Sequence, residues 1–325
     1  MKKKMQILFV AIMIVLGLGT LAPSVSFGTG YPDHPIQLII PYVPGATGDI
    51  TARMLADEME KILGVKIIPS NKPGAGTVLG AEAAVRAKKD GYTLFYGGAS
   101  PFVFAPIANP EVVKYDPAKD VEPLGFHYFF PSVVGVKADA PWKNFKEFVD
   151  YAKKNPGKIR ISSIGVGSST HFAIELLQSI TGIKLIHVPF EGGEATVTAV
   201  MGGHVEATLD GYGKLKPHVE GGRMRILLIE PKKPTHPEIP TLKELGYKQN
   251  LFATWFGLWA PAGIPEEARR VLVPAVEKAV KNTKVRIENL GSICEYKSPA
   301  ETRKLRDDEY KEAYAIALKI GLRKP

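Results

Sequence analysis

Apolar, β-forming runs alternate with amphipathic segments from residue 36 onward, and this alternation limits the possible folds more than any other feature. Residues 36–41, 65–69 and 92–96 have the composition of buried strands. Between them, residues 49–63 and 80–88 carry apolar side chains near helical spacing and are followed by glycine-containing turns. The order strand–helix–strand–helix–strand predicts a parallel, doubly wound α/β sheet.

A second series of the same kind follows the first. Its expected strands are residues 132–136, 159–163, 185–188, 205–209 and 226–229, and its expected helices are residues 144–155, 170–181 and 194–201. The chain has 325 residues, which is more than one domain usually holds. The two series do not visibly repeat one sequence, so we expect two α/β lobes of similar architecture.

The C-terminal part of the chain is richer in helix. A strand is expected at 255–260, a long helix begins near Pro265, and further helices are expected near 284–289 and 299–320. Proline is well tolerated at a helix start, because its missing N–H has no intrahelical partner there. The segment has too few strands for a third domain, so we expect it to return to the first lobe.

This return divides the chain between the lobes in a definite way. Lobe 1 is expected to comprise residues 29–128 and 254–325, and lobe 2 residues 129–253. The chain then crosses between the lobes twice, near 126–131 and near 251–254. Two crossings make a hinge with a cleft, which is where a ligand is expected.

The N-terminus has the layout of a secretory signal peptide. Lys2, Lys3 and Lys4 precede an apolar run, residues 7–21, and small residues follow it. We therefore expect residues 1–28 to be a signal peptide and the protein to be periplasmic or otherwise extracytoplasmic. An uncleaved membrane anchor is the competing interpretation, because the run is near the shortest length that spans a bilayer. The single cysteine, Cys294, allows no intramolecular disulfide, and we expect it to be a buried apolar residue.

The charge does not indicate a nucleic-acid partner. The formal net charge is +9, and the three leader lysines supply part of it. The remaining basic residues are scattered, so they indicate a solvated surface with a mild attraction for anions. The histidines show no metal-ligand spacing. No P-loop occurs, and Thr170 stands where a dinucleotide-binding loop needs its third glycine. We expect no metal and no cofactor.

Three turns rich in small residues precede expected helices and make a binding site for an anion plausible. They are residues 45–49, 71–84 and 164–177. Free backbone N–H groups at a helix start, together with the helix dipole, favour a negative ligand, and glycine lets the ligand approach the backbone. A carboxylate fits as well as a phosphate. The plain alternative is that Asp49 and Thr170 are ordinary N-caps of their helices.

Catalytic chemistry has a weaker basis. Ser168 and Ser169 lie close to His171, which allows a hydrolase as an alternative, but no Gly-x-Ser-x-Gly elbow occurs. Asp210 follows an expected strand and is either a general acid or base or a hydrogen-bonding residue of the cleft. Because no partner carboxylate or nucleophile is evident beside it, binding without catalysis is the simpler interpretation.

Five segments, taken in order, resemble one known family. They are YPDHPIQLIIPYVPGATGDITARMLADEM, NKPGAGTVLGAEAAVRAKKDGYTL, GSSTHFAIELL, HVPFEGGEATVTAVMGGHVEATLDG and FGLWAPAGIPEEARRVL. The chain is similar to the substrate-binding proteins of tripartite tricarboxylate transporters, also called the TctC or Bug family, from Tyr31 to the last helices. The resemblance implies a type II periplasmic-binding-protein fold and a receptor that delivers a small organic acid to membrane transporter subunits. We expect a monomer.

The resemblance also implies the residues that hold the ligand. In the family, two loops grip a carboxylate through backbone amides, small hydroxyls and bound water. The matching residues are Tyr42, Pro44, Gly45, Ala46, Thr47, Gly48 and Asp49, then Ser168, Ser169, Thr170 and His171, with Ala75, Gly76, Phe190, Gly192, Gly193 and Asp210 lining the cleft. The first loop departs from the usual Pro-Gly-Gly-Ser/Thr-x-Asp, since Ala46 replaces a glycine and Gly48 supplies one later. A sensor that presents its ligand to a membrane kinase is the alternative role, and the identity of the acid stays open.

Overall fold

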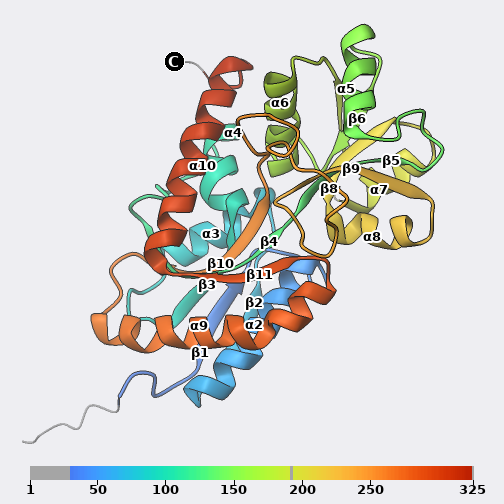
Figure 1. The fold of residues 1–325 in the computed structure, drawn as a ribbon. Coiled ribbons are helices and arrows are strands. Elements are labelled where there is room, and N and C mark those ends of the chain that lie inside the picture. Colours follow the sequence, from blue (N-terminus) through green and yellow to red (C-terminus); the bar gives the residue numbers. More distant parts are fainter. Residues whose placement is uncertain (1–29, 191–192, 324–325) are drawn as a thin grey trace, which may run out of the picture.

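The computed structural model describes residues 30–190 and 193–323, and its strands form two sheets (Figure 1). The first sheet has the strand order β11-β4-β10-β3-β1-β2. β1 is parallel to β2 and β3, whereas β10 is antiparallel to β3 and β4, and β11 is antiparallel to β4. The strands are β1 (Ile36–Ile40), β2 (Ile67–Asn71), β3 (Thr93–Gly98), β4 (Val121–Phe130), β10 (Thr254–Pro261) and β11 (Ile293–Lys297).

Helices cover both faces of this sheet, because successive side chains of a strand point to opposite faces. Leu38 of β1 packs in a core with α2 and α9, whereas its neighbour Ile39 packs in the core that contains α3 and α10. The helices are α2 (Thr47–Leu63), α3 (Val78–Val85), α4 (Ala105–Ala108), α9 (Glu266–Asn289) and α10 (Pro299–Lys319), with the short helices η1 (Ala75–Thr77) and η2 (Ser100–Phe104) beside α3 and α4.

The second sheet has the order β7-β6-β8-β5-β9 and is also sandwiched between helices (Figure 1). Val134 of β5 faces the core that holds α5 and α6, and Val133 faces the core that holds α7 and α8. The elements are β5 (Ser132–Lys137), α5 (Phe145–Lys154), β6 (Arg160–Ser163), α6 (Ser169–Thr181), β7 (Ile186–Pro189), α7 (Gly193–Met201), β8 (Ala207–Gly211), α8 (Tyr212–Glu220) and β9 (Met224–Glu230).

The two sheets therefore form the two α/β lobes that the sequence predicts. One residue, Pro131, separates β4 of the first sheet from β5 of the second. The hydroxyl of Ser132 donates a hydrogen bond to the carbonyl of Phe252 at 2.9 Å, so the two crossing segments lie side by side. The lobe boundaries at 128/129 and 253/254 stay a prediction.

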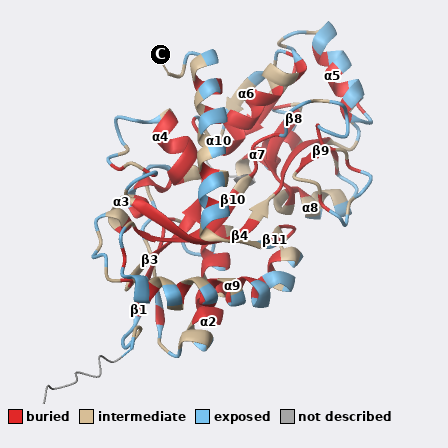
Figure 2. Ribbon diagram, turned by 60° about the vertical axis from the view of Figure 1, so that its left-hand side comes forward, coloured by how far each residue is buried: buried red, intermediate tan, exposed pale blue. Residues whose placement is uncertain are grey.

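One hydrophobic core is continuous between the lobes. It joins Phe104 of η2, Phe172 of α6 and Phe252, with ring centroids 5.2 and 5.5 Å from that of Phe104. Figure 2 shows the buried residues along the strands and on the inner faces of the helices. Cys294 is buried, as expected, and burial raises the pKa of its thiol to about 12.

Several expected boundaries are corrected by the structure. α2 begins at Thr47 rather than 49 and α6 at Ser169 rather than 170. The separate helix expected at 284–289 is the end of α9, which continues through Asn282 and Thr283 because these weak helix formers make tertiary hydrogen bonds.

The short helices η1, η2 and α4 were not predicted, and neither were three longer elements: β4, α8 and β11. β4 is buried on both faces and so lacks the alternation of a half-buried strand. α8 contains Gly213 and Pro217, and because both residue types are common in loops, its sequence does not indicate a helix. In the described part of the chain, no helix is long and apolar enough to cross a membrane. The expected signal peptide, residues 1–28, lies outside the described residues.

Candidate functional site

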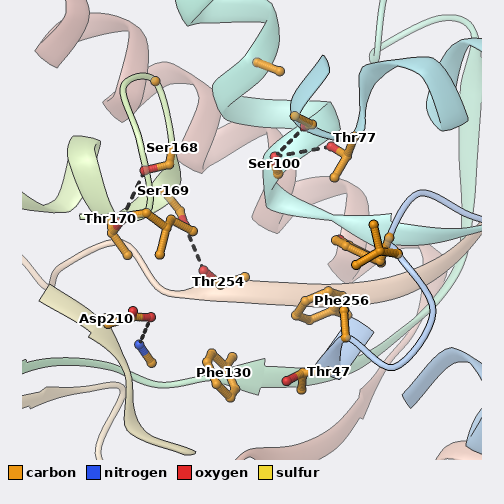
Figure 3. Close-up of a pocket in the computed structure, with 18 of the residues that line it drawn as sticks. Thr47, Thr77, Ser100, Phe130, Ser168, Ser169, Thr170, Asp210, Thr254 and Phe256 are labelled. Atoms are coloured by element: carbon orange, nitrogen blue, oxygen red, sulfur yellow. Dashed lines mark hydrogen bonds between the residues drawn. The ribbon is translucent and has the colours of Figure 1, made fainter. Parts of the chain in front are cut away.

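A cavity of about 790 Å³ lies between the two sheets, a volume within the range of small-molecule sites. Figure 3 shows Ser168, Ser169, Thr170 and Asp210 on one side of it, Thr47 and Phe256 on the other, and Thr254 between them. The cavity is lined by Tyr42, Val43, Gly45, Ala46, Thr47, Ala75, Gly76, Thr77, Ser100, Ala105, Asn109, Phe130, Ile164, Val166, Gly167, Ser168, Ser169, Thr170, Asp210, Gly211, Lys214, Thr254 and Phe256.

The N-terminus of α2 opens into this cavity. Its N-cap, Ala46, has no side-chain acceptor for the first turn. Thr47, the first residue of the helix, lines the cavity, and its backbone N–H has no acceptor among the described residues. A Cβ on Gly48 would meet the Tyr42 ring at 2.5 Å, and Gly45 has a φ of +83°. These two glycines let the loop fold tightly under Tyr42 while its backbone faces the cavity.

Asp49 holds this loop from behind. It is buried, it is the third residue of α2 and not the N-cap, and its Oδ2 accepts from the backbone N–H of Gly45 at 2.9 Å. Its Oδ1 accepts from Arg53 Nε at 2.9 Å and from Asn71 Nδ2 at 2.7 Å. Burial raises the pKa of this carboxyl, but the hydrogen bonds from Asn71 and Gly45 and the Arg53 charge outweigh burial and lower the pKa.

The N-terminus of α6 forms the facing wall. Ser168 is its N-cap: the serine Oγ accepts from the backbone N–H of His171 at 3.2 Å and donates to the carbonyl of Gly165 at 2.7 Å. Thr170 is the second residue of the helix rather than its cap. The Ser169 hydroxyl pairs with that of Thr254 at 2.8 Å, which joins this wall to the strand β10.

The ring of His171 is held by the loop that precedes α6 and by a second histidine. Its Nδ1 accepts from the backbone N–H of Gly167 at 3.0 Å, and the ring stacks on that of His187 with centroids 4.3 Å apart. Burial lowers the pKa of His171, which favours the neutral ring that this bond requires. Within the described residues, neither Ser168 nor Ser169 hydrogen-bonds this ring, so His171 activates neither of these two serines.

The 75–77 turn supplies a third part of the wall. Ala75 and Thr77 have φ values of +46° and +84°, which are strained for residues with a Cβ. Thr77 Oγ1 donates to Ser100 Oγ at 3.3 Å, and Ser100 Oγ donates to the carbonyl of Gly76 at 3.1 Å. These bonds hold the turn against η2 and keep its small residues at the cavity surface.

Among the described residues that line the cavity, only Asp210 and Lys214 carry charged side chains, with Lys214 Nζ 3.1 Å from Asp210 Oδ1. Asp210 is the second-last residue of β8, and it also accepts from Thr196 Oγ1 at 2.6 Å and from the backbone N–H of Gly211 at 2.7 Å. The cavity wall therefore carries little net charge, and its polar character comes from hydroxyls, backbone amides and this one ion pair.

Most of the residues expected from the sequence meet at this cavity. Tyr42, Gly45, Ala46, Thr47, Ala75, Gly76, Ser168, Ser169, Thr170 and Asp210 line it. Pro44, Gly48, Asp49, His171 and Phe190 do not line it, whereas Gly192 and the surroundings of Gly193 lie outside the described part of the chain. Asp49 and His171 instead fix the loops from behind.

The sequence reasoning missed several wall residues. Ser100 follows the carboxyl end of β3, Gly211 is the last residue of β8, and Lys214 follows it. Ligands of open α/β sheets bind at the carboxyl ends of strands, so this rule could have identified these three residues. Phe130, Thr254 and Phe256 come from antiparallel strands near the lobe crossings, which no local pattern marks. Among the described residues, no cluster of three metal-ligating side chains occurs.

Comparison with known proteins gives a consistent picture. A family model described as the tripartite tricarboxylate transporter family receptor matches residues 51–322. A Cupriavidus necator protein called the UPF0065 protein in gbd 5'region is 34% identical over 313 residues, which cover 95% of this chain and 94% of that protein.

Three solved structures share the fold over nearly their whole length. The periplasmic binding protein BugD is 28% identical with a TM-score of 0.75, covering 91% of this chain and 100% of its own. An R. palustris protein with adipate is 25% identical with a TM-score of 0.77, covering 90% and 98%. MatC from Rhodopseudomonas palustris with bound malate is 26% identical with a TM-score of 0.74, covering 88% and 99%.

Proposed function

The chain belongs to the tripartite tricarboxylate transporter family of receptors, as its motifs predict, and on that premise we propose that it is an extracytoplasmic solute-binding receptor for a small organic acid. In this proposal residues 1–28 direct export, and the mature protein delivers its ligand to a tripartite tricarboxylate-type membrane transporter. Similar proteins solved with adipate and malate support a carboxylate as the ligand.

The observation that carries the proposal is the placement of two helix N-termini at one cavity. α2 presents Thr47 from the first lobe, and α6 presents Ser169 and Thr170 from the second. Each terminus carries backbone N–H groups without intrahelical acceptors and the positive end of a helix dipole, which together favour an anion. A carboxylate between the two termini bridges the lobes.

The physical advantage of this arrangement is preorganisation. The amides are fixed by the helices, so they need little reorientation when the ligand binds. We propose that the predicted residues that line the cavity contact the ligand, and that Asp49 and His171 act as positioning residues. Closure of the lobes excludes water, and each hydrogen bond becomes stronger in the lower local dielectric.

Two alternative roles have less support. A hydrolase using Ser168 or Ser169 with His171 needs a serine–histidine hydrogen bond, whereas the His171 Nδ1 is occupied by the N–H of Gly167. A sensor that presents its ligand to a membrane kinase needs the same cavity, so the two receptor roles differ in the outer surface of the lobes and share the binding chemistry.

A thermal-shift screen of the protein lacking residues 1–28 tests the proposal. The panel contains succinate, malate, citrate, glutamate, adipate, benzoate, terephthalate and nicotinate, with glucose and phosphate as controls. Ligand at about a hundred times its Kd stabilises the fold by about 2.7 kcal/mol, a shift of a few degrees in Tm. A shift with one or two organic acids, recovered unchanged, supports the receptor; shifts with the controls alone, or chemical turnover, contradict it.

The backbone-amide part of the proposal has its own test. Thr47→Pro removes one cavity-facing N–H at the first position of α2, where proline is tolerated. Ala46 already has the extended backbone, φ −64° and ψ 154°, that a following proline requires. We expect Thr47→Pro to weaken binding of the acid identified in the screen more than Thr47→Ala does, because Thr47→Ala keeps the N–H. Equal effects of the two variants argue against amide binding.

A further inference from the structure

The two charged groups at the cavity differ in how many of their hydrogen-bonding positions are already used within the protein. Asp210 and Lys214 are the only charged residues in that part of the cavity lining which the structure describes. Lys214, in the first turn of α8, lies four positions after Asp210 of β8, and their side chains pair at 3.1 Å. The acceptors and donors that these two groups do not use within the protein decide which ligand charge the cavity favours.

Asp210 has little left to offer. Its side chain is 2% exposed, and it accepts three hydrogen bonds: from Lys214 Nζ and the Gly211 N–H at Oδ1, and from Thr196 Oγ1 at Oδ2. A ligand ammonium needs a carboxylate with an accessible oxygen. Because the negative charge of Asp210 is already shared among three donors, the cavity is poorly suited to the amino group of an amino acid.

Lys214 has unused donors. Its ammonium carries three N–H groups. One donates to Asp210, and the structure gives the other two no acceptor within the described residues. The side chain is 23% exposed at the cavity wall, so the ammonium is partly desolvated and accessible from the cavity. This is the arrangement that a second anionic group of a ligand needs.

We propose that Lys214 selects ligands with a second anionic group, so that this receptor prefers dicarboxylates to monocarboxylates and amino acids. The inference rests on the proposed function: the N-termini of α2 and α6 hold one carboxylate, and Lys214 receives the other. Charge-assisted hydrogen bonds of this kind are stronger than neutral ones. The alternative role for Lys214 is structural, with its ammonium serving only to neutralise Asp210.

Calorimetry with matched ligand pairs separates these roles. Adipate is compared with hexanoate and succinate with butanoate, since each pair differs only in the second carboxylate. Glutamate is the amino-acid probe and is compared with glutarate, which lacks the amino group. The variants are Lys214→Met, Lys214→Arg and the control Lys216→Met. Lys216 lies on the same helix, does not line the cavity and has a distant partner, Glu220, at 3.9 Å. The control therefore makes the same change of net charge away from the site.

We expect the unaltered protein to bind the better diacid about tenfold to a hundredfold more tightly than its monoacid partner. Lys214→Met removes most of this ratio while changing monoacid affinity about twofold or less, Lys214→Arg keeps part of it, and Lys216→Met leaves it unchanged. A double variant, Asp210→Asn with Lys214→Met, leaves no unpaired charge at the wall. It serves as a second test in case the buried Asp210 without its partner disturbs the fold of Lys214→Met. We expect it also to lack the preference for diacids.

Three results overturn the inference. They are a ratio near one in the unaltered protein, tighter binding of glutamate than of glutarate, and equal loss of diacid and monoacid affinity in Lys214→Met and in the double variant. If monoacids bind and diacids bind no better, the receptor proposal stands and only the role of Lys214 fails. If no organic acid of either class binds the unaltered protein, the proposed function fails, and this inference fails with it.

Discussion

At the scale of single residues, Asp49 shows how a carboxylate can serve an anion site without touching the anion. It is buried behind the cavity wall and ties the N–H of Gly45 to Arg53 and Asn71. A negative charge in the first turn also suits the positive end of the α2 dipole. Its hydrogen bonds hold the loop in the shape that leaves the amides of α2 open to the cavity.

The first prediction concerns this residue. Asp49→Ala leaves the Gly45 N–H and the Asn71 amide without their acceptor, so we expect it to lower the free energy of unfolding by about 1–3 kcal/mol and to weaken ligand binding. Urea unfolding and calorimetry measure the two effects. Asp57→Ala, at an exposed position of the same helix, is the control and should change neither. Unchanged affinity in Asp49→Ala would remove its positioning role.

We expect the cavity wall formed by the N-terminus of α6 to be sensitive to pH because of His171. Burial lowers the pKa of His171, and burial together with the nearby His171 lowers that of His187 to about 4. Glu175 also faces the His171 ring, with Oε1 3.9 Å from Nε2, and burial raises the pKa of that carboxyl. Protonation of the His171 Nδ1 would break the bond that it accepts from Gly167.

The second prediction follows from the sign of this shift. A folded-state pKa below the unfolded value of about 6.5 means that the unfolded chain binds protons first, so stability is present above that pH and is lost as the pH falls through the folded-state pKa. We expect a lower free energy of unfolding and weaker binding at about pH 5 than at about pH 7.5. His171→Asn should reduce this dependence, whereas His34→Gln, at an exposed site, should keep it. Equal pH dependence in all three proteins would contradict the role of His171.

At the scale of elements, a helix N-cap in this protein can stabilise its helix and can also shape the loop at the cavity, and the two functions occur separately. Ser168 caps α6 and also holds the 164–167 loop through the Gly165 carbonyl. Ser298 caps α10 in a capping box with Glu301, and neither residue lines the cavity. The same kind of hydrogen bond therefore stabilises one helix beside the site and another that contributes nothing to the cavity wall.

The third prediction compares these two caps. Ser168→Ala and Ser298→Ala should each lower the free energy of unfolding by about 1 kcal/mol, because each helix loses a side-chain acceptor for a first-turn N–H. Only Ser168→Ala should also weaken ligand binding, since only that serine shapes the cavity. Chemical denaturation and calorimetry provide the comparison. Loss of binding in both variants would mean that global stability, and not the shape of the loop, controls affinity.

At the scale of the whole molecule, the lobes are less independent than a simple hinge implies. Phe104 of the first lobe packs against Phe172 of the second, and the amino group of Lys319 in α10 donates to the Ser179 hydroxyl of α6 at 2.7 Å. The core that contains these phenylalanines extends through both sheets. Opening of the cleft must leave this shared core intact, so we expect the lobes to move mainly on the cavity side.

The fourth prediction is that the two lobes unfold together. Trp255 and Trp259 lie in the first sheet, whereas Trp142 lies beside the second lobe's core. In a Trp142→Phe variant, tryptophan fluorescence reports on the first lobe alone and far-ultraviolet circular dichroism on both. We expect the two unfolding curves to coincide. Phe172→Ala should lower the free energy of unfolding obtained from each curve by about 3–5 kcal/mol. Separate transitions would show that the shared core does not couple the lobes.

The sequence by itself determined the class of fold and the places where backbone meets the cavity. The alternation of strands and helices predicted two α/β lobes, and the small residues around Gly45 and Ser168 predicted two helix N-termini at a site. These features are local: hydrophobic periodicity, glycine and the capping residues act within about one turn or one strand, so a single sequence contains them in full.

Tertiary structure alone decided how those parts act together. The resemblance placed Asp49 and His171 among the ligand-binding residues, which stays a prediction; only packing shows that their side chains hydrogen-bond the N–H groups of Gly45 and Gly167. It also brought Phe130 and Thr254 from the strands near the lobe crossings into the cavity and paired Lys214 with Asp210 there. Such contacts depend on which side chains share a buried space after distant strands have paired, and no local pattern records that geometry.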